Sequence, residues 1–211
     1  MSSLTSSPGD LAQRLQGLNL YLVGMMGAGK SAVGRPLAEA LGYRFLDADR
    51  VLEAAAGRPI PEIFQTDGEE GFRELETAVL DRIAGWHSLV VATGGGVVTR
   101  SVNWGHLHQG VVIWLDAPAA VLLGRLQADP TPRPLLATAD PAARLQTLLE
   151  SRRPLYAQAD LRVEALGSED PATVARRVVE ALPTILRERI EPPAGPARLE
   201  DDEGNPTHSL N

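Results

Sequence analysis

A glycine-rich segment near the N-terminus has the residue types and spacing of a phosphate-binding loop. Residues 24–31 read GMMGAGKS and fit the pattern Gly-x-x-x-x-Gly-Lys-Ser/Thr. Its glycines let backbone N–H groups converge on phosphate oxygens, and Lys30 can bridge the β- and γ-phosphates of a nucleotide. The hydroxyl of Ser31 is suited to holding Mg²⁺. Because an apolar run precedes the segment and a helical pattern follows it, the loop predicts nucleotide binding.

Two acids lie where an acceptor could be bound. Asp47 and Asp49 follow a short strand expected at 43–46. Side chains two residues apart at a strand end point the same way, and ligands of open α/β folds bind at this edge of the sheet. One carboxylate could therefore face Mg²⁺ and the other an acceptor hydroxyl. An alternative is that one of them only caps the helix expected to start near Arg50.

A basic residue on a predicted helix offers a binding group for an anion. Arg73 and Glu76 are three residues apart and share one helix face. A glutamate there can hold the guanidinium in one orientation, and a fixed guanidinium binds a carboxylate or a phosphate through two hydrogen bonds. The alternative is an exposed ion pair that contributes little.

Three further segments carry candidate binding residues. Gly94–Gly96 follow an apolar run at 88–92 after one residue, Thr93, and three glycines permit close approach of a ligand to the backbone. Arg133 lies in an aperiodic segment, where a mobile loop could exclude water and neutralise charge on a transferred phosphoryl group. Arg152 and Arg153 end a helical pattern, and either could simply interact with the helix dipole.

The elements that must position these residues alternate along the chain. Apolar runs without polar alternation, separated by helical patterns, predict a parallel sheet covered by helices on both faces. Strands are expected at 18–23, 43–46, 88–92, 111–115 and 161–163. Helices are expected at 30–41, 49–56, 60–66, 69–85, 118–126, 142–157 and 171–187.

Length and composition favour one domain. The chain has 211 residues, a net charge of −7 and no cysteine, so disulfides and thiolate metal sites are excluded. The charge disfavours nucleic acid and anionic lipid as partners, and no apolar run is long enough to span a membrane or to form a secretory signal. We expect a cytoplasmic monomer with a flexible arm at 1–17, in which 10–16 could form a short helix, a kinase domain at 18–190 and a disordered acidic tail at 191–211.

Taken together, these motifs resemble the shikimate kinases, within the nucleoside-monophosphate-kinase-like group. The matching segments span about residues 18–185 and occur in family order: GMMGAGKS at 24–31, LDADR at 46–50, GFRELE at 71–76, GGG at 94–96, RPLL at 133–136 and RRPLY at 152–156. The resemblance implies a three-layer α/β/α fold with a five-stranded parallel sheet. It also implies substrate-binding helices at about 48–85 and a mobile lid at about 127–140.

The resemblance also implies a reaction, ATP-dependent phosphorylation of the 3-hydroxyl of shikimate to shikimate 3-phosphate in aromatic amino-acid biosynthesis. The expected shikimate-binding residues are Asp49, Arg73, Gly94, Gly95, Gly96 and Arg152. The expected ATP-binding residues are Gly27, Ala28, Gly29, Lys30, Ser31, Ala32, Arg125 and Arg133. Mg²⁺ is assigned to Ser31 and Asp47, and catalysis to Lys30, Asp49 and Arg133. Asp49 either acts as the base or only orients the hydroxyl.

Two alternatives to this reaction remain open on the sequence. One is another small-molecule kinase of the same architecture, such as a gluconate or nucleotide kinase. A nucleotide acceptor would need a base pocket, which neither the glycine turn nor the helix around Arg73 suggests. The other alternative is a kinase-like regulator that binds ligand without turnover. Lost catalytic residues would favour a regulator, but Lys30, Ser31, Asp47, Asp49 and Arg133 are all present.

Overall fold

The computed structural model describes residues 8–129, 131, 133–167 and 169–190, and the predicted tail at 191–211 lies outside this part. A single sheet contains five strands: β1 (Leu20–Val23), β2 (Arg44–Asp47), β3 (Leu89–Ala92), β4 (Val111–Asp116) and β5 (Leu161–Glu164). The helices are α1 (Pro8–Leu15), α2 (Lys30–Leu41), α3 (Ala48–Ala56), α4 (Ile60–Ala84), α5 (Ser101–Leu107), α6 (Ala119–Ala128), α7 (Pro141–Tyr156) and α8 (Pro171–Ile190), with short 3₁₀ turns η1 (Val97–Thr99) and η2 (Pro134–Leu136).

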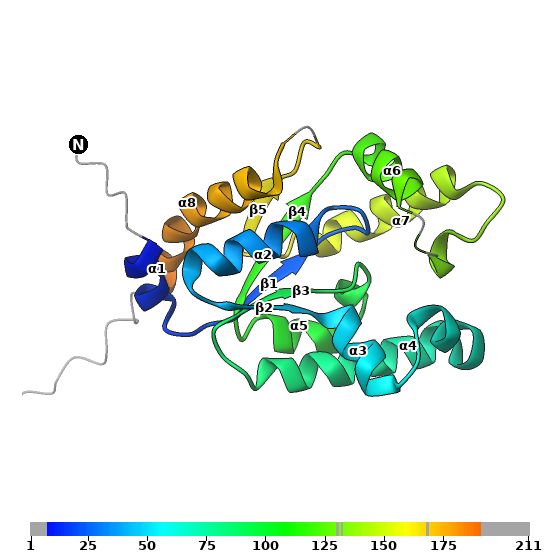
Figure 1. The fold of residues 1–211 in the computed structure, drawn as a ribbon, viewed down its shortest axis with the longest axis horizontal. Helices are drawn as coiled ribbons and strands as arrows, with labels where there is room; N and C mark the ends of the chain where they lie inside the picture. The colour runs from blue at the N-terminus through cyan, green and yellow to red at the C-terminus, as the bar shows by residue number, and fades with distance from the viewer. Residues whose placement is uncertain (1–7, 130, 132, 168, 191–211) are drawn as a thin grey trace, which may run out of the picture.

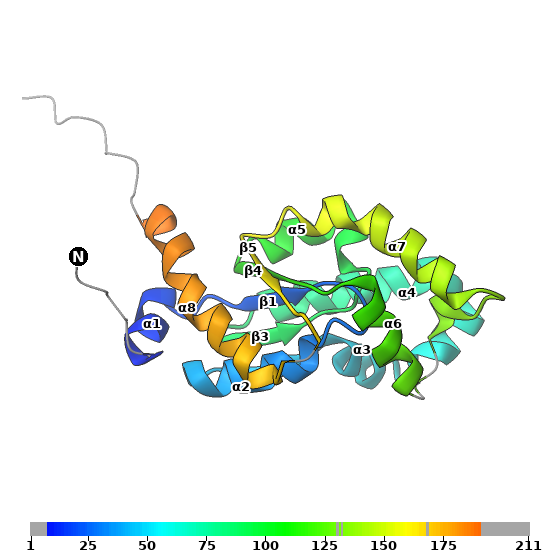
Figure 2. The same cartoon turned by 90° about the horizontal axis from the view of Figure 1, so that it is seen from above.

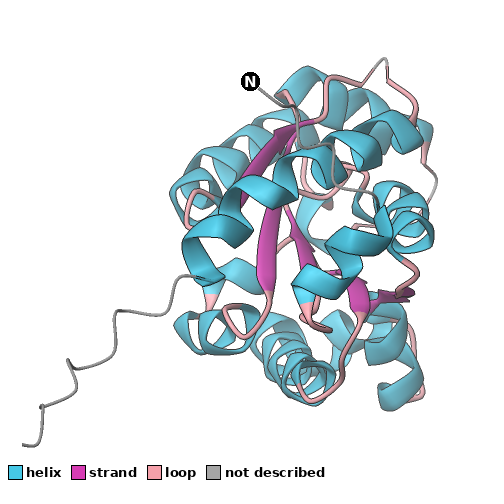
Figure 3. Ribbon diagram, turned by 90° about the vertical axis from the view of Figure 1, so that its left-hand side faces the viewer, coloured by secondary structure: helices cyan, strands magenta, loops and turns pink. Residues whose placement is uncertain are grey.

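All neighbouring strands pair in parallel, in the order β2-β3-β1-β4-β5. The predicted five-stranded parallel sheet is therefore confirmed. Helices lie on both of its faces, as Figures 1 and 3 show, which gives the three layers expected. Each expected strand and helix is present with its ends within three residues of those expected. The helix α5 was not expected.

Alternating side chains divide each buried strand between two hydrophobic cores. Leu20 and Leu22 of β1 pack in the core formed with α1, α2 and α8. Tyr21 and Val23 point to the opposite face and pack with α4 and α5. Because both faces of the strand are covered, all four residues are buried and apolar. The view from above in Figure 2 shows the sheet between α2 and α8 on one side and α5 on the other.

The expected arm at 1–17 contains the short helix that we considered at 10–16, and this helix is packed into the core. Residues 8–15 form helix α1, and its side chains Leu11 and Leu15 are fully buried in the core beneath α2 and α8. The apolar spacing of two leucines four residues apart gives one short helix face, which is stable because it packs against two longer helices. Only residues 1–7 of the expected arm lie outside the described residues.

The long helix α4 bends at the place where two helices were expected to meet. Gly68 has φ 73° and ψ −175°, a backbone conformation open to glycine, and it separates residues 60–67 from the half that carries Arg73. The break turns the second half back along the sheet, beside α5.

The strand order brings three loops together at one sheet edge. The neighbours of β1 are β3 and β4, so the phosphate loop after Val23 lies beside the glycine turn after Ala92. Asp47 pairs with Ala92 in register, which places the acidic pair at the same edge. This is the carboxyl edge, where open α/β sheets bind their ligands. Among the described residues, no helix is both long and apolar enough to cross a membrane.

Candidate active site

The phosphate loop ends in a helix start that lacks a side-chain cap. Gly29 occupies the cap position of α2 with φ 93°, a left-handed conformation that favours glycine. Gly29 has no side chain that could accept a hydrogen bond from the first N–H groups of α2. Such N–H groups, together with the positive end of the helix dipole, form a site for an anion.

Lys30 is held inside this loop. Its ammonium donates to the carbonyls of Gly24 at 2.8 Å and of Met25 at 3.0 Å. Burial lowers its pKa from 10.5 to about 8, although the carboxylates of Asp49 and Asp47 oppose the shift. Because its ammonium is held within the phosphate loop, Lys30 is suited to neutralising a phosphate bound there.

Asp47 caps a helix and also contacts the phosphate loop. Its Oδ1 atom accepts hydrogen bonds from the N–H groups of Asp49 and Arg50, at 3.2 and 3.4 Å, and so caps helix α3. Its Oδ2 atom accepts a hydrogen bond of 2.6 Å from the hydroxyl of Ser31. A hydroxyl oxygen and a carboxylate oxygen side by side are suitable ligands for Mg²⁺. This ion is typically bound by one or two carboxylates, water and substrate phosphates.

A cavity of about 290 Å³ lies over the phosphate loop. Most of the predicted nucleotide-binding residues line it: Gly27, Gly29, Lys30, Ser31, Ala32, Arg125 and Arg133. Ala28 does not line it, because its side chain is buried in the core and its N–H donates to the carbonyl of Met25 at 3.0 Å. The guanidinium of Arg125 donates to the carbonyl of Gly27 at 3.0 Å.

A second cavity of about 500 Å³ adjoins the first, and the predicted acceptor residues line it: Asp49, Arg73, Gly94, Gly95, Gly96 and Arg152. Ser31, Asp47, Asp49, Gly95 and Arg133 line both cavities. Burial raises the pKa of Asp49, and the charge of Lys30 partly offsets this. A carboxylate with a raised pKa is a better proton acceptor than a free one.

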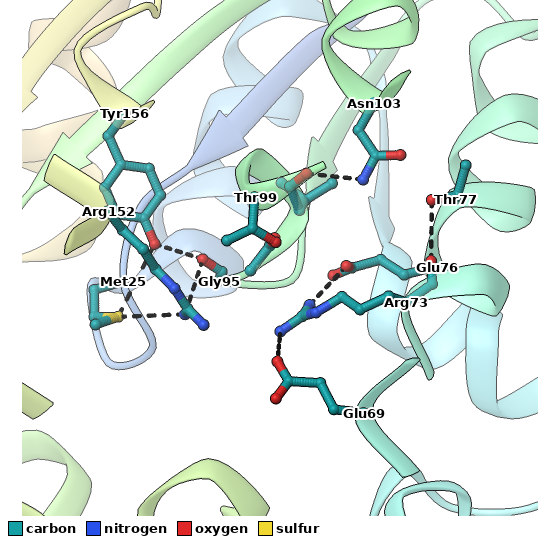
Figure 4. Close-up of polar contacts among 12 residues, drawn as sticks. Met25, Glu69, Arg73, Glu76, Thr77, Gly95, Thr99, Asn103, Arg152 and Tyr156 are labelled. Atoms are coloured by element: carbon teal, nitrogen blue, oxygen red, sulfur yellow. Dashed lines mark hydrogen bonds and ion pairs between the residues drawn. The ribbon is translucent and has the colours of Figure 1, made fainter. Parts of the chain in front are cut away.

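The pair of Arg73 and Glu76 is buried, which excludes the exposed alternative. Both side chains are 6% exposed, and Arg73 Nη1 lies 2.7 Å from Glu76 Oε2. A further carboxylate, that of Glu69, contacts Arg73 Nη2 at 3.2 Å. Figure 4 shows the guanidinium held between the two acids, with its end directed toward the glycine turn. Burial disfavours the charged form of Arg73, but the carboxylates of Glu76 and Glu69 together have the larger effect and raise the pKa of Arg73.

The glycine turn comes so close to Arg73 that it leaves no room for a side chain. A β-carbon at Gly96 would overlap the guanidinium of Arg73. At Gly95, a β-carbon would lie 3.1 Å from the backbone nitrogen of Met26, so the turn also packs against the phosphate loop. Close backbone approach therefore explains at least two of the three glycines.

The two arginines near the end of α7 have different surroundings. Arg152 is 4% exposed, lines the acceptor cavity and has its Nη1 atom 3.4 Å from the carbonyl of Gly95. Arg153 is half-exposed and pairs with Asp116 at 3.5 Å, outside both cavities. The choice of Arg152 for the anion site thus agrees with the geometry.

Sequence reasoning missed several residues around these cavities. Asp129 binds Arg133 at 2.6 Å, and Tyr156 hydrogen-bonds Gly95 from beneath the turn. Tyr156 is part of the RRPLY motif at 152–156, so this motif could have pointed to it. Apolar residues also line the acceptor cavity: Met26, Phe72, Pro134 and Leu135 lie within the quoted motifs, whereas Ile60, Pro61 and Phe64 lie outside them, so no motif pointed to them. Two lid residues, Pro130 and Pro132, lie outside the described residues.

Comparison with known proteins identifies relatives of this chain. The family model for shikimate kinase matches residues 26–183. A shikimate kinase of Synechococcus sp. (strain RCC307) is 64% identical over 177 residues, which cover 84% of this chain and 90% of that protein.

Solved structures agree with this relationship. A shikimate kinase from Acinetobacter baumannii, in complex with shikimate, has a TM-score of 0.78 and 39% identity and covers 86% of this chain and 99% of its own. A gluconokinase from Sinorhizobium meliloti 1021 has a TM-score of 0.55 at 20% identity, covering 82% of this chain and 95% of its own, so its likeness concerns the fold alone. By the family match and by the identity to relatives covered over most of their length, the chain belongs to the shikimate kinase family.

Proposed function

We propose that this chain transfers the γ-phosphoryl group of ATP to the 3-hydroxyl of shikimate. The observation that carries the proposal is the pair of adjoining cavities, which share the walls at Ser31, Asp49 and Arg133. One cavity covers a phosphate loop, and the other contains two buried arginines for a carboxylate. The family membership and the complex of the Acinetobacter baumannii relative with shikimate support the choice of acceptor.

The proposed step is an in-line transfer. Asp49 takes the proton of the 3-hydroxyl, and the hydroxyl oxygen forms a bond to the γ-phosphorus. The bond from this phosphorus to the oxygen that bridges it to the β-phosphate breaks, and ADP leaves. Lys30 and Arg133 neutralise the charge that spreads over the phosphate oxygens. Arg73 and Arg152 hold the carboxylate so that the hydroxyl meets the phosphate.

We assign Mg²⁺ to Ser31 and Asp47, which lie 2.6 Å apart on the phosphate side of the site. When bound with ATP, the ion would neutralise phosphate charge. The protein contribution is to hold the two oxygens together, since Asp47 is fixed by the N–H groups at the start of α3.

A coupled ADP-release assay tests the proposal with shikimate and gluconate as competing acceptors. We expect turnover with shikimate and none above background with gluconate. Lys30→Met should abolish turnover and leave the far-ultraviolet circular dichroism spectrum unchanged, because it removes one charge from the phosphate site. Absence of turnover with shikimate in the unaltered chain, or normal activity of Lys30→Met, would contradict the proposal.

Two further expectations stay predictions, a monomeric state and a cytoplasmic location. The absence of cysteine is compatible with a reducing compartment. Light scattering of the purified chain and fractionation of the source cells would check them.

A further inference from the structure

The glycine turn has an unusual set of partners on its carbonyl side. The carbonyls of residues 95–98 each accept a hydrogen bond from a side chain. The donors, in order, are Tyr156, Thr99, Asn103 and Trp104. The last three belong to the segment that directly follows the turn. Tyr156 alone among these donors comes from a distant element, the end of α7, as Figure 4 shows.

Tyr156 is well fixed as a donor. Its side chain is fully buried, and its ring stacks on Trp114 with the centroids 5.9 Å apart and the planes at 23°. Burial raises the pKa of its hydroxyl to about 12, so the group keeps its proton at neutral pH. The same hydroxyl also contacts the sulfur of Met25 at 3.9 Å, which links the turn to the phosphate loop.

Fixing this carbonyl also fixes the next N–H group. The described chain has no cis peptide bond, and in a trans peptide the carbonyl and the following N–H point in opposite directions. With the Gly95 carbonyl directed to Tyr156, the Gly96 N–H points away from Tyr156. Gly96 lines the acceptor cavity, and it lies so close to Arg73 that a β-carbon on it would overlap the guanidinium.

We propose that Tyr156 is a positioning residue for the acceptor, since its hydroxyl holds the Gly95 carbonyl and thereby directs the Gly96 N–H toward the bound shikimate. The inference rests on the proposed function. The proposal also concerns Arg152, whose Nη1 atom lies 3.4 Å from the carbonyl of Gly95. Without the tyrosine hydroxyl, Arg152 becomes the remaining side-chain partner of Gly95 and is drawn away from the carboxylate. The direction of the Gly96 N–H and the position of Arg152 both affect the binding of shikimate rather than the binding of ATP.

Tyr156→Phe tests the inference, because it keeps the ring on Trp114 and removes only the hydroxyl. We expect the KM for shikimate to rise about fivefold or more, the scale of one lost buried hydrogen bond, while the KM for ATP stays within about twofold. Calorimetric binding of shikimate without nucleotide should weaken by a similar factor. Tyr21→Phe is the matched control, since Tyr21 is fully buried on β1 and accepts a hydrogen bond from Asn19.

The outcomes separate the inference from the proposed function. No turnover of the unaltered chain with shikimate means that the proposed function fails. Normal turnover, with Tyr156→Phe raising the shikimate KM no more than Tyr21→Phe does, overturns the positioning role. Equal rises in KM for shikimate and ATP also overturn it, because they indicate a general loss of packing. A selective rise for shikimate, with thermal midpoints alike in the two variants, supports the role.

Discussion

The charge of Lys30 is the most pH-sensitive feature of the phosphate site. Its side chain is buried at the start of α2, and burial brings its pKa to about 8. Below that pH the ammonium is present to bind phosphate, and above it the neutral amine predominates. Bound ATP favours the charged form and therefore raises this pKa.

ATP affinity should accordingly fall as the pH rises through about 8, by up to about tenfold per pH unit, until the pKa of the ATP-bound form is reached. Calorimetry at several pH values between 7 and 9.5 measures this, and binding should take up protons in that window. Lys30→Met is the control, since its residual ATP binding should lack this dependence. If the ATP affinities of the unaltered chain and of Lys30→Met changed with pH in the same way, the pH effect would come from groups other than Lys30.

Arg73 is the residue whose charge and geometry both bear on the acceptor. Arg73→Ala should raise the KM for shikimate by about tenfold to a hundredfold, the scale of a lost charge-assisted pair. Arg73→Lys should recover only part of this, because an ammonium retains the charge but lacks the planar fork of donors. Steady-state kinetics with both substrates measures the effect, and an unchanged shikimate KM in Arg73→Ala would remove this residue from the site.

At the scale of elements, the bend in α4 decides where Arg73 lies. The first half of this helix supplies apolar cavity residues, and the second half supplies Phe72 and Arg73. Gly68 connects the halves with a backbone conformation that residues with a β-carbon rarely adopt. The bend therefore allows both halves of α4 to contribute residues to the lining of the acceptor cavity.

Gly68→Ala should lower the free energy of unfolding by about 1–3 kcal/mol, the cost of a residue strained in this region. It should also raise the KM for shikimate, because the half that carries Arg73 shifts. Gly124→Ala is the matched control in α6, where a β-carbon meets nothing within 4 Å and alanine should stabilise the helix by about 1 kcal/mol. Urea denaturation measures both, and equal effects of the two substitutions would argue against strain at Gly68.

At the scale of the whole molecule, the N-terminal helix completes one of the two cores. Leu11 and Leu15 are fully buried beside α2 and α8, on the face of the sheet away from α4 and α5. The acceptor cavity is lined largely from the other side and from the carboxyl edge. We therefore expect the stability of this core and substrate binding to be separable.

Leu15→Ala should reduce the free energy of unfolding by about 2–5 kcal/mol, as is usual for a buried leucine that leaves a cavity. The KM values for ATP and shikimate should remain unchanged at temperatures where the variant is folded. Val102→Ala, at a side chain that is 53% exposed, should change stability by less than about 0.5 kcal/mol. A Leu15→Ala variant as stable as Val102→Ala would restore the flexible arm that the sequence suggested.

The sequence by itself determined the local features of this protein. Continuous apolar runs predicted the strands, because burial on both faces of a sheet leaves no polar alternation. A spacing of about 3.6 residues predicted nearly all the helices, because burial on one face leaves a helical stripe. The pattern Gly-x-x-x-x-Gly-Lys-Ser predicted the phosphate loop. The residues expected at the acceptor site came from the resemblance to the shikimate kinases, because spacing alone left a helix cap or an exposed ion pair as alternatives. Helix α5 was missed because its seven residues include glycine, asparagine and histidine and carry only a weak apolar stripe.

Only the tertiary structure decided which contacts these residues make. The sequence left open whether Asp47 caps a helix or faces the phosphate site, and the fold shows that it contacts both α3 and Ser31. It also could not show that the pair of Arg73 and Glu76 is buried, or that Tyr156 holds the Gly95 carbonyl from a helix 61 residues away. The physical reason is that burial and long-range hydrogen bonds depend on the strand order, which brings distant segments to one sheet edge and is not encoded in any local spacing.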